Sequence, residues 1–271
     1  MPELPEVETT VRGLARHLDA ERLERVTLNR PDMRFSFPDG FVQRLTGARI
    51  VGLGRRAKYG LLHTDRDLTV IFHLGMSGRW RIDPEAIGKH DHLVLETAGH
   101  RFALCDPRRF GFVDLVATEA LDQWPAFAAM GPEPLGPELS AGHLKAAFAG
   151  RKQAVKLLLL DQRVVAGLGN IYVCEALYRA RIDPRKPAGK VTKPALERLI
   201  GAIREVLGEA IEAGGSSLRD YARPDGELGY FSKRFDVYGR EGEGCRRGDG
   251  GHVRRIAQGG RSTWFCPKCQ R

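Results

Sequence analysis

The sequence predicts a multidomain α+β protein with an N-terminal helix, an antiparallel β-sandwich, a helical region and a small basic tail. Short strand-like segments separated by Gly, Pro and Asp fill the first 116 or so residues. Apolar residues then recur with the helical period, and three of the five cysteines fall in the last 27 residues. A chain of 271 residues can bury more than one core. We therefore divide it at 1–130, 131–232 and 233–271.

The N-terminal region predicts one helix followed by strands. Pro5 suits a first helical position, and the apolar residues Val7, Val11, Leu14 and Leu18 recur at helical spacings. Six strands are expected at Leu23–Asn29, Ala48–Arg55, Leu68–Leu74, His92–Thr97, Arg101–Cys105 and Gly111–Ala117. Strands that follow one another without intervening helices favour an antiparallel sandwich over an α/β sheet.

After the Gly- and Pro-rich segment 131–137 the pattern becomes helical. Ser140 is the expected N-cap of a helix that extends through Phe148. Segments 161–169 and 170–180 predict a helix, a tight glycine turn and a second helix. Lys193–Ala213 predicts the longest helix, because its apolar residues form one stripe and Gly214-Gly215 follow it.

The charge balance favours a polyanionic partner such as nucleic acid. Lys and Arg number 43 against 34 Asp and Glu, which gives +9, and residues 233–271 alone contribute +6. No apolar run approaches the ~18 residues needed to cross a membrane, and residues 1–20 do not resemble a secretory signal. An odd number of cysteines without a signal favours a reducing compartment. We expect a cytoplasmic protein with a metal site in the tail and no membrane partner.

The N-terminus has the chemistry of an imine-forming nucleophile. A small residue after Met1 usually permits removal of the methionine, which would leave Pro2 with a free secondary amine. An α-amino group has a pKa of about 7.7–8.0 against about 10.4 for Lys, so near neutral pH much more of it is unprotonated. Glu3 and Glu6 supply carboxyl groups nearby. The alternative is that Pro2 only starts a helix and that the acidic residues only favour its first turn.

Eight short motifs extend this pattern along the whole chain. They are MPELPEVE (1–8), RAKYG (56–60), HLGMSG (73–78), KHDH (89–92), DPRRFG (106–111), GLGNIY (167–172), VYGREG (237–242) and CPKCQ (266–270). In this order they resemble the motifs of the bacterial formamidopyrimidine-DNA glycosylases. Eight motifs in sequence are far more specific than any one of them.

The resemblance implies a bifunctional DNA glycosylase/AP lyase. Such an enzyme excises oxidised purines, namely 8-oxoguanine and formamidopyrimidines, from duplex DNA and then cleaves the strand by β,δ-elimination. Pro2 would attack the sugar C1′ to form a Schiff base, with Glu3 as general acid/base and Glu6 as support. Lys58 would assist β-elimination and contact a phosphate, and Arg261 would grip phosphates and assist δ-elimination. Lys58 and Arg261 could otherwise be solvated surface cations.

The same resemblance implies a set of DNA-binding residues. Met76, Arg108 and Phe110 would form a wedge, since extruding a base costs a few kcal/mol and leaves a hole and an orphaned partner base. The alternatives are a core Phe110 and a surface Arg108. Further DNA contacts are implied at His90, Arg151, Lys156 and Asn170. Asn170 ends a glycine turn that resembles a helix–two-turn–helix element, whose backbone amides hold phosphates. Segment 217–230 resembles the loop that closes over the extruded base.

A C-terminal β-hairpin zinc finger with one altered ligand is implied for the tail. Cys266 and Cys269 keep the C-x2-C spacing of the family, but after Cys245 a glycine stands where the next cysteine should be. In the family, the second ligand usually lies seventeen positions before the cysteine that corresponds to Cys266, and in this chain that position is Asp249. Carboxylate oxygen is an acceptable ligand at about 2.0–2.2 Å. His252 is the better donor but is expected in the strand. A three-Cys site completed by water, or a hairpin without metal, remains open.

These inferences predict one structural Zn²⁺, no organic cofactor, and a monomer acting on damaged double-stranded DNA. One rival is the sister glycosylase that prefers oxidised pyrimidines, whose N-terminus typically reads Pro-Glu-Gly-Pro-Glu where this chain has Pro-Glu-Leu-Pro-Glu. The other is a lesion-binding protein without catalysis, which would tolerate the loss of Pro2 or Glu3.

Overall fold

The computed structural model describes residues 2–216 and 230–271, which fall into two compact units. The sandwich unit contains residues 1–128 and 211–232, and the helical unit contains residues 129–210 and 233–271. The C-terminal tail thus groups with the helical region by contact. The division into three domains stays a prediction, because compactness alone defines these two units.

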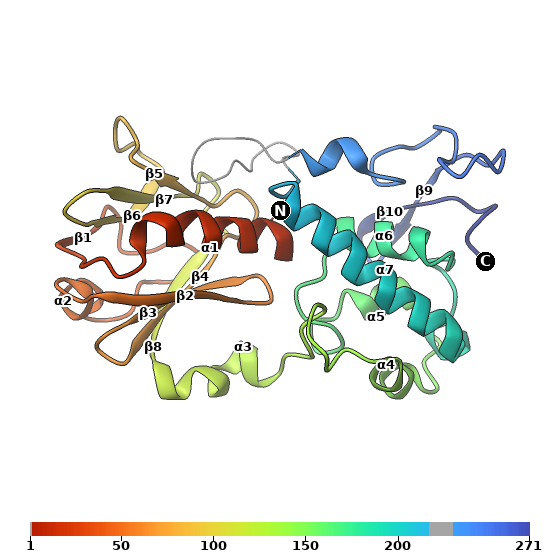
Figure 1. The fold of residues 1–271 in the computed structure, drawn as a ribbon, viewed down its shortest axis with the longest axis horizontal. Helices are drawn as coiled ribbons and strands as arrows, with labels where there is room; N and C mark the ends of the chain where they lie inside the picture. Colours follow the sequence, from red (N-terminus) through yellow and green to blue (C-terminus); the bar gives the residue numbers. More distant parts are fainter. Residues whose placement is uncertain (1, 217–229) are drawn as a thin grey trace. The chain divides into compact units, whose positions relative to one another are not determined.

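The sandwich unit is built from two antiparallel four-stranded sheets, as predicted (Figure 1). One sheet has the order β1 (Arg25–Leu28), β6 (Asp91–Glu96), β7 (Arg101–Cys105), β5 (Arg79–Ile82). The other has the order β2 (Ile50–Arg56), β3 (Tyr59–Thr64), β4 (Leu68–His73), β8 (Phe112–Ala117). The short helices α2 (Phe41–Leu45), η1 (Thr118–Gln123) and α3 (Pro125–Ala128) complete this unit.

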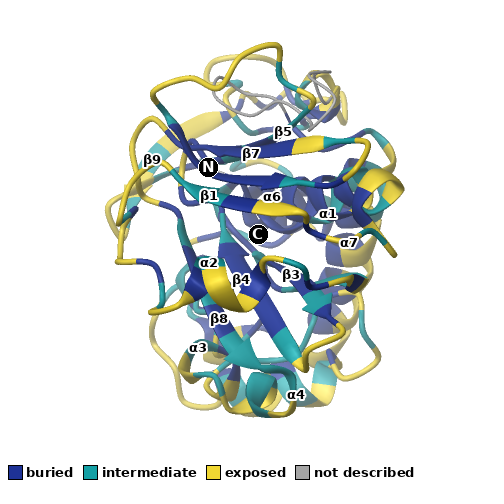
Figure 2. Cartoon of the chain, turned by 90° about the vertical axis from the view of Figure 1, so that its left-hand side faces the viewer, coloured by how far each residue is buried: buried dark blue, intermediate teal, exposed yellow. Residues whose placement is uncertain are grey.

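Helix α1 (Leu4–Leu18) covers this sandwich with its apolar face. Val7, Val11, Leu14 and Leu18 are all buried, as the spacing predicted, and the helix packs against β2, β3 and β5. The inward faces of both sheets add large buried side chains, including Phe72, Trp80 and Phe102, to the same core. Figure 2 shows this buried interior between exposed loops. Burial of this face fixes α1, and with it the N-terminus.

The sequence pattern missed the strands β3 and β5. In β3 the apolar run is short, and Gly60 lowers the strand signal. That glycine is required by packing, because a Cβ there would lie 2.0 Å from the ring of Phe72. In β5 the buried Trp80 stands between Arg79 and Arg81, so the segment looks polar in the sequence.

The helical unit contains α4 (Ala141–Phe148), α5 (Val155–Leu159), α6 (Asn170–Arg179), η2 (Ala188–Lys190), most of α7 (Lys193–Glu212) and the hairpin β9 (Arg254–Gln258) and β10 (Arg261–Phe265). A further short helix, η3 (Phe231–Arg234), begins in the last residues of the sandwich unit and ends in the tail. Ser140 caps α4, with its Oγ accepting the His143 N–H at 3.1 Å. The apolar stripe of α7 is buried, and Gly214 and Gly215 follow it with φ of +77° and +84°. These predictions are confirmed.

The predicted helix over 161–169 is wrong. The first helix of the pair is α5, which lies earlier, and residues 161–169 form turns. The side chain of Gln162 organises these turns: its amide group donates to the carbonyls of Leu160 (3.2 Å) and Leu168 (2.9 Å), and its oxygen accepts the Gly167 N–H (2.8 Å). Gly167 has φ of +77°, which few other residues adopt. The second predicted helix is confirmed as α6.

Within the described residues, no helix is both long and apolar enough to cross a bilayer. The predicted base-covering loop 217–230 lies, apart from Tyr230, outside the residues that the structure describes.

Candidate functional site

The N-terminus is held by a reciprocal capping box at the start of α1. Glu3 is the N-cap and is only 2% exposed. Its side chain accepts the backbone N–H of Glu6, while its own N–H donates to Glu6 Oε2 at 2.8 Å. The preceding residue, Pro2, is also buried. The capping box therefore fixes two carboxyl groups next to Pro2.

Glu6 is further fixed by the end of the segment that follows α7. The backbone N–H and the hydroxyl of Ser216 both donate to Glu6 Oε1 at 2.8 Å. Gly215 makes this approach possible, because a Cβ there would lie 3.2 Å from Glu6 Oε1 and its φ is +84°. With its carboxylate engaged in this way, Glu6 is suited to support the site.

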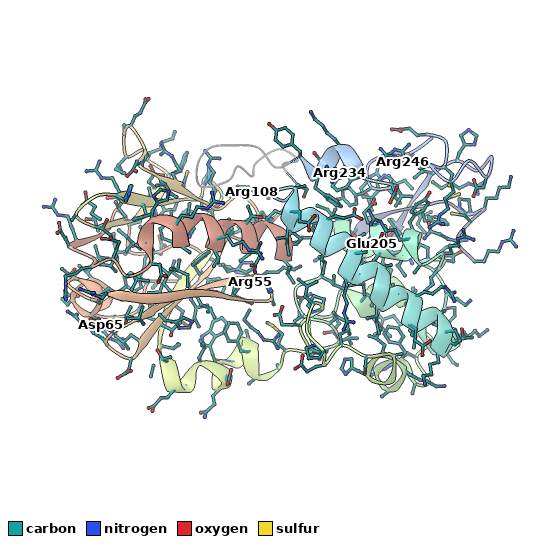
Figure 3. All side chains as sticks on the ribbon, in the orientation of Figure 1. Arg55, Asp65, Arg108, Glu205, Arg234 and Arg246 are labelled. Atoms are coloured by element: carbon teal, nitrogen blue, oxygen red, sulfur yellow. The ribbon has the colours of Figure 1, made fainter. Side chains whose placement is uncertain are left out.

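Lys58 lies in the tight turn between β2 and β3. An ion pair between Arg55 on β2 and Glu8 on α1 fixes that turn. Arg55 donates through Nη1 to the carbonyl of Ala57 (2.9 Å) and through Nε to Glu8 Oε2 (2.9 Å). Burial opposes ionisation of Glu8, but hydrogen bonds from Arg55 and Arg12 hold the pKa of this carboxyl below its usual range. Figure 3 labels Arg55 next to α1. The helix that begins beside Pro2 thus also positions the turn that presents Lys58.

The three predicted wedge residues lie on two neighbouring loops. Met76 is in the β4–β5 loop, and Arg108 and Phe110 are in the β7–β8 loop. Met76 and Phe110 are exposed (37% and 43%), and the Arg108 guanidinium lies 4.7 Å from the centre of the Phe110 ring. All three line a hollow of about 750 Å³. Its wall also includes Arg34, His73 and Arg109. Exposed apolar side chains over a hollow fit the predicted wedge and not a core.

Buried Asp106 joins these two loops. Its Oδ1 accepts the Ser77 hydroxyl (2.6 Å) and the Arg108 N–H (3.3 Å), and its Oδ2 accepts the Gly111 N–H (2.8 Å). The backbones also touch, since a Cβ on Gly75 would lie 2.3 Å from the nitrogen of Gly111. The backbone of Asp106 is bonded as well: its N–H donates to the carbonyl of the half-buried His90 at 3.0 Å, and its carbonyl accepts the Arg109 N–H at 3.2 Å. The wedge is therefore preorganised.

His73 belongs to this site but was not among the predicted residues. Its Nδ1 accepts the Gly75 N–H at 3.1 Å, and its ring stacks on Phe112 with centroids 5.6 Å apart. Burial, together with the charges of Lys58 and Arg34, lowers the pKa of His73 to about 4, against an opposing effect of Asp106. The imidazole is thus neutral at pH 7. The available sequence signal was its place at the start of the HLGMSG motif.

In the helical unit, two predicted DNA-binding residues hold the hairpin strand β10. Asn170 begins α6 and donates through Nδ2 to the carbonyl of Ser262 at 2.9 Å. The Lys156 ammonium donates to the same carbonyl (3.1 Å) and to the hydroxyl of Thr263 (2.6 Å). Lys156 is fully buried (0%), so the prediction of a direct DNA contact needs correction. Lys156 positions β10, and its charge does not reach the surface.

Two other predicted residues do present their charge to solvent. Arg261 begins β10 directly after Gly259 and Gly260, and Arg151 follows α4. Both side chains are exposed, and neither has an ion-pair partner in the described part of the chain. Such cations are available for a phosphate.

The positive charge of the chain is concentrated in the helical unit. Its 23 Lys and Arg against 12 Asp and Glu give +11, whereas 20 against 22 in the sandwich unit give −2. An unbalanced charge of this size favours a polyanion, and nucleic acid is the most abundant one in a cell. The helical unit therefore has the electrostatic character of a nucleic-acid interface.

The predicted metal ligands meet at one point in the tail. Ligand atoms of Cys245, Asp249, Cys266 and Cys269 all lie within 4.8 Å of one another. The Sγ atoms of Cys245 and Cys269 are 3.9 Å apart, and Cys266 Sγ is 3.7 Å from Asp249 Oδ2. A tetrahedral zinc with bonds of about 2.3 Å to sulfur and about 2.0–2.2 Å to oxygen needs edges of similar length. The residues therefore fit a structural Zn²⁺.

Asp249, not His252, completes this set, as the register predicted. The Gly251 N–H donates to Asp249 Oδ1 at 2.7 Å and lowers the pKa of this carboxyl, which favours the ionised ligand. The expectation that His252 lies in the hairpin strand is wrong. His252 is exposed and forms an isolated bridge with Gly244, and β9 begins only at Arg254.

Glu175 was also missed by the sequence reasoning. This buried side chain on α6 accepts the backbone N–H groups of Asp236 (2.7 Å), Val237 (3.0 Å) and Tyr238 (2.8 Å), at the start of the tail. Burial raises the pKa of the Glu175 carboxyl, and the three N–H groups oppose that rise. A single acidic residue among the apolar residues of α6 was the available signal.

Comparison with known families gives three matches that together span most of the chain. Residues 1–113 match the formamidopyrimidine-DNA glycosylase N-terminal domain, and residues 130–222 match the H2TH (helix–two-turn–helix) domain of the same glycosylase. Residues 250–271 match a zinc finger found in FPG (the same glycosylase) and IleRS.

Relatives and solved structures agree with these matches over the full length. Proteins named formamidopyrimidine-DNA glycosylase from Erythrobacter litoralis and Novosphingobium aromaticivorans are 73% and 69% identical, and both chains are covered completely. The fold is similar to a Lactococcus lactis Fpg complex with abasic-site DNA (34% identity, TM-score 0.92, complete coverage of both chains). It is also similar to MutM (Fpg) from Thermus thermophilus (39% identity, TM-score 0.89, 99% and 98% coverage).

Proposed function

The chain belongs to the formamidopyrimidine-DNA glycosylase family, and on that basis we propose which of its residues perform each step of lesion removal. The protein is a DNA glycosylase for oxidised purines that also cleaves the abasic strand. It acts on damaged double-stranded DNA, and we propose that it does so as a monomer. The proposed location is the bacterial cytoplasm, where the chromosome lies. The proposed domains are residues 1–130, 131–232 and 233–271.

Base removal begins at Pro2. After loss of Met1, the lone pair of the Pro2 nitrogen attacks the sugar C1′ and forms the C–N bond while the glycosidic bond breaks. Glu3 delivers a proton that assists base departure and opening of the sugar ring, which yields an iminium ion between Pro2 and C1′. The capping box supports this role, because it holds Glu3 next to Pro2 through a hydrogen bond to Glu6.

Strand cleavage follows from the same iminium ion. Loss of a C2′ proton drives β-elimination of the 3′ phosphate, and δ-elimination then releases the 5′ phosphate. Lys58 is proposed to hold the phosphate and assist the first elimination, and Arg261 to assist the second. The product is a one-nucleotide gap with phosphorylated ends.

The wedge residues and the helical unit are proposed to hold the bent, opened duplex. Met76 and Phe110 would fill the space left by the extruded base, and Arg108 would hydrogen-bond the orphaned cytosine. His90, Arg151 and Asn170 would contact the backbone. Lys156 contributes by fixing β10, which presents Arg261. When bound, zinc stabilises the hairpin through Cys245, Asp249, Cys266 and Cys269, and it takes no part in the chemistry.

One observation supports these roles best: the buried Pro2–Glu3–Glu6 arrangement at the start of α1. To test it, the protein is incubated with an 8-oxoguanine:cytosine duplex and with a thymine-glycol duplex, and the iminium ion is reduced with borohydride. Peptide mass spectrometry should find the adduct on a peptide that begins at Pro2, with the 8-oxoguanine duplex giving more of it. Intact strands and no N-terminal adduct would contradict the proposal, and preference for thymine glycol would favour the sister enzyme.

A further inference from the structure

The helical unit has a hollow of about 330 Å³ that the proposed mechanism does not use. It lies where the end of α4, the short helix η2 and the start of α7 meet. Buried Phe148 and Val191 are part of its wall. Lys145, Lys190 and Lys193, one from each of these elements, are exposed at its surface.

No counter-charge to these three lysines lies within the residues that the structure describes. In the described part of the chain, none of their ammonium groups has an ion-pair or hydrogen-bond partner. The surrounding segments contain no acidic residue at all between 139 and 160 or between 184 and 196. The next acidic residue on α7 is Glu197, one turn beyond Lys193, and the two form no ion pair. Three like charges around one hollow repel each other, and an anion between them removes that repulsion.

The hollow is joined to Arg151, which is already a proposed DNA contact. The Arg151 N–H donates to the carbonyl of Phe148 (3.0 Å), and the Gly189 N–H donates to the carbonyl of Arg151 (3.0 Å). The fit is close, because a Cβ on Gly189 would lie 3.2 Å from the Arg151 carbonyl oxygen. The backbone that carries the exposed Arg151 side chain is therefore bonded to two residues of the wall of this hollow, Phe148 and Gly189.

We propose that this hollow binds a backbone phosphate of duplex DNA outside the lesion. The inference rests on the proposed function, because it extends the DNA contact that begins at Arg151. Lysine ammonium groups are compact point charges that attract phosphate without base readout or bidentate geometry. The three-lysine hollow thus lengthens the stretch of duplex DNA that the protein contacts, whatever its base sequence. It also contributes affinity for intact DNA.

The test compares salt dependence of binding to an undamaged duplex. The dissociation constant is measured over a range of salt for the wild type, for K145Q/K190Q/K193Q and for R16Q/R25Q/R44Q. The control variant removes the same charge from exposed positions of the sandwich unit. Each lost phosphate contact reduces the slope of log K against log salt by about 0.9. We expect the triple-lysine variant to lose about one unit of slope or more, and the control to keep the wild-type slope.

Two results would overturn the inference: an unchanged slope in the triple-lysine variant, or an equal loss in the control, which would mean that only net charge matters. A second measurement uses the wild type itself. Lysine acylation followed by peptide mass spectrometry should show that duplex DNA protects Lys145, Lys190 and Lys193, and equal acylation with and without DNA would contradict the proposal. Failure here is distinguishable from failure of the proposed function, because borohydride trapping at Pro2 does not depend on this hollow.

Discussion

Single buried carboxylates determine the geometry of this site. Glu6 and Asp106 are almost fully buried (1% and 0%). Glu6 accepts hydrogen bonds from Ser216, and Asp106 accepts them from the two loops that present the wedge residues. Burying a carboxylate costs several kcal/mol unless hydrogen bonds compensate it. The hydrogen bonds to Glu6 and Asp106 therefore offset the cost of their burial only while the donor segments stay in place.

The link between Ser77 and Asp106 gives the first prediction. S77A removes the 2.6 Å hydrogen bond to Asp106 Oδ1 and leaves that buried oxygen with only the longer bond from the Arg108 N–H. This loss should lower the free energy of unfolding by about 1–3 kcal/mol. The loosened wedge should slow excision of 8-oxoguanine more than cleavage at a preformed abasic site, where no base has to be extruded.

Single-turnover rates on the two substrates and denaturant unfolding measure these effects. The exposed Ser36 offers a matched control in S36A. Equal slowing on both substrates would contradict the role of this link in base extrusion.

His73 gives a prediction about acid stability. Its pKa falls from 6.5 in the unfolded chain to about 4 in the folded protein, so between these values the unfolded state binds more protons. The stabilisation from neutral His73 is complete above pH 6.5 and is lost as the pH falls towards 4.

H73Q should therefore lose less stability than the wild type between pH 7 and pH 4, by up to ~3 kcal/mol. Denaturant unfolding of both proteins at several pH values measures the difference. Parallel stability curves would show that His73 titrates normally in the folded state.

At the scale of elements, α6 is central to the helical unit. Its first residue, Asn170, holds β10, and Glu175 in its middle holds the start of the tail. Near its end, Tyr178 lies with its hydroxyl 3.3 Å from Cys245 Sγ. One helix thus positions both the hairpin and a metal ligand.

The Asp249 ligand gives the prediction for this scale. Carboxylate binds zinc less strongly than thiolate, so D249C should retain zinc longer than the wild type, and D249A should lose it first. Even partners outside the ligand set change metal affinity by 10–100-fold, so differences of roughly tenfold or more are expected. Transfer of zinc to a chromogenic chelator measures the order. H252A serves as a control, and zinc loss from it as fast as from D249A would contradict the assigned ligand set.

Much of this arrangement could be predicted from the sequence, and the exceptions have physical causes. Apolar periodicity predicted α1 and α7, because each of them buries one face. The Ser140 cap predicted α4, and turn residues between apolar segments predicted six strands. The helix prediction failed at 161–169, where the amide of Gln162 and not a helical ladder satisfies the backbone. Lys156 was misplaced because a motif match does not show whether an ammonium group faces solvent or a buried carbonyl. The hydrogen bond between Ser77 and Asp106, 29 residues apart, has no signal in local sequence.

For the whole molecule, charge and chemistry are separated between the two units. The proposed catalytic residues, apart from Arg261, belong to the sandwich unit, whose net charge is −2, and the helical unit has +11. Affinity for any duplex should thus come mainly from the helical unit, and reaction at the lesion mainly from the sandwich unit.

This separation predicts that salt acts on KM much more than on kcat. Lys58, Arg151 and Arg261 are three proposed phosphate contacts, so the slope of log K against log salt should be at least ~2.7 in magnitude. Steady-state kinetics on an 8-oxoguanine:cytosine duplex over a range of salt separates the two constants. A kcat that falls as steeply as kcat/KM would indicate that salt disturbs the chemical step itself.

The Asp249 ligand also has a consequence for oxidative stress, the condition in which oxidised purines accumulate. Thiolate ligands can be oxidised to sulfenic acid and beyond, whereas a carboxylate ligand cannot. Cys245 and Cys269 have their sulfurs 3.9 Å apart and can pair as a disulfide once the metal is lost, which leaves Cys266 without a partner among the ligands. A four-cysteine finger could instead close two disulfides. Peroxide should therefore leave the finger with one disulfide and one unpaired thiol, and reduction of that disulfide restores the ligands for zinc.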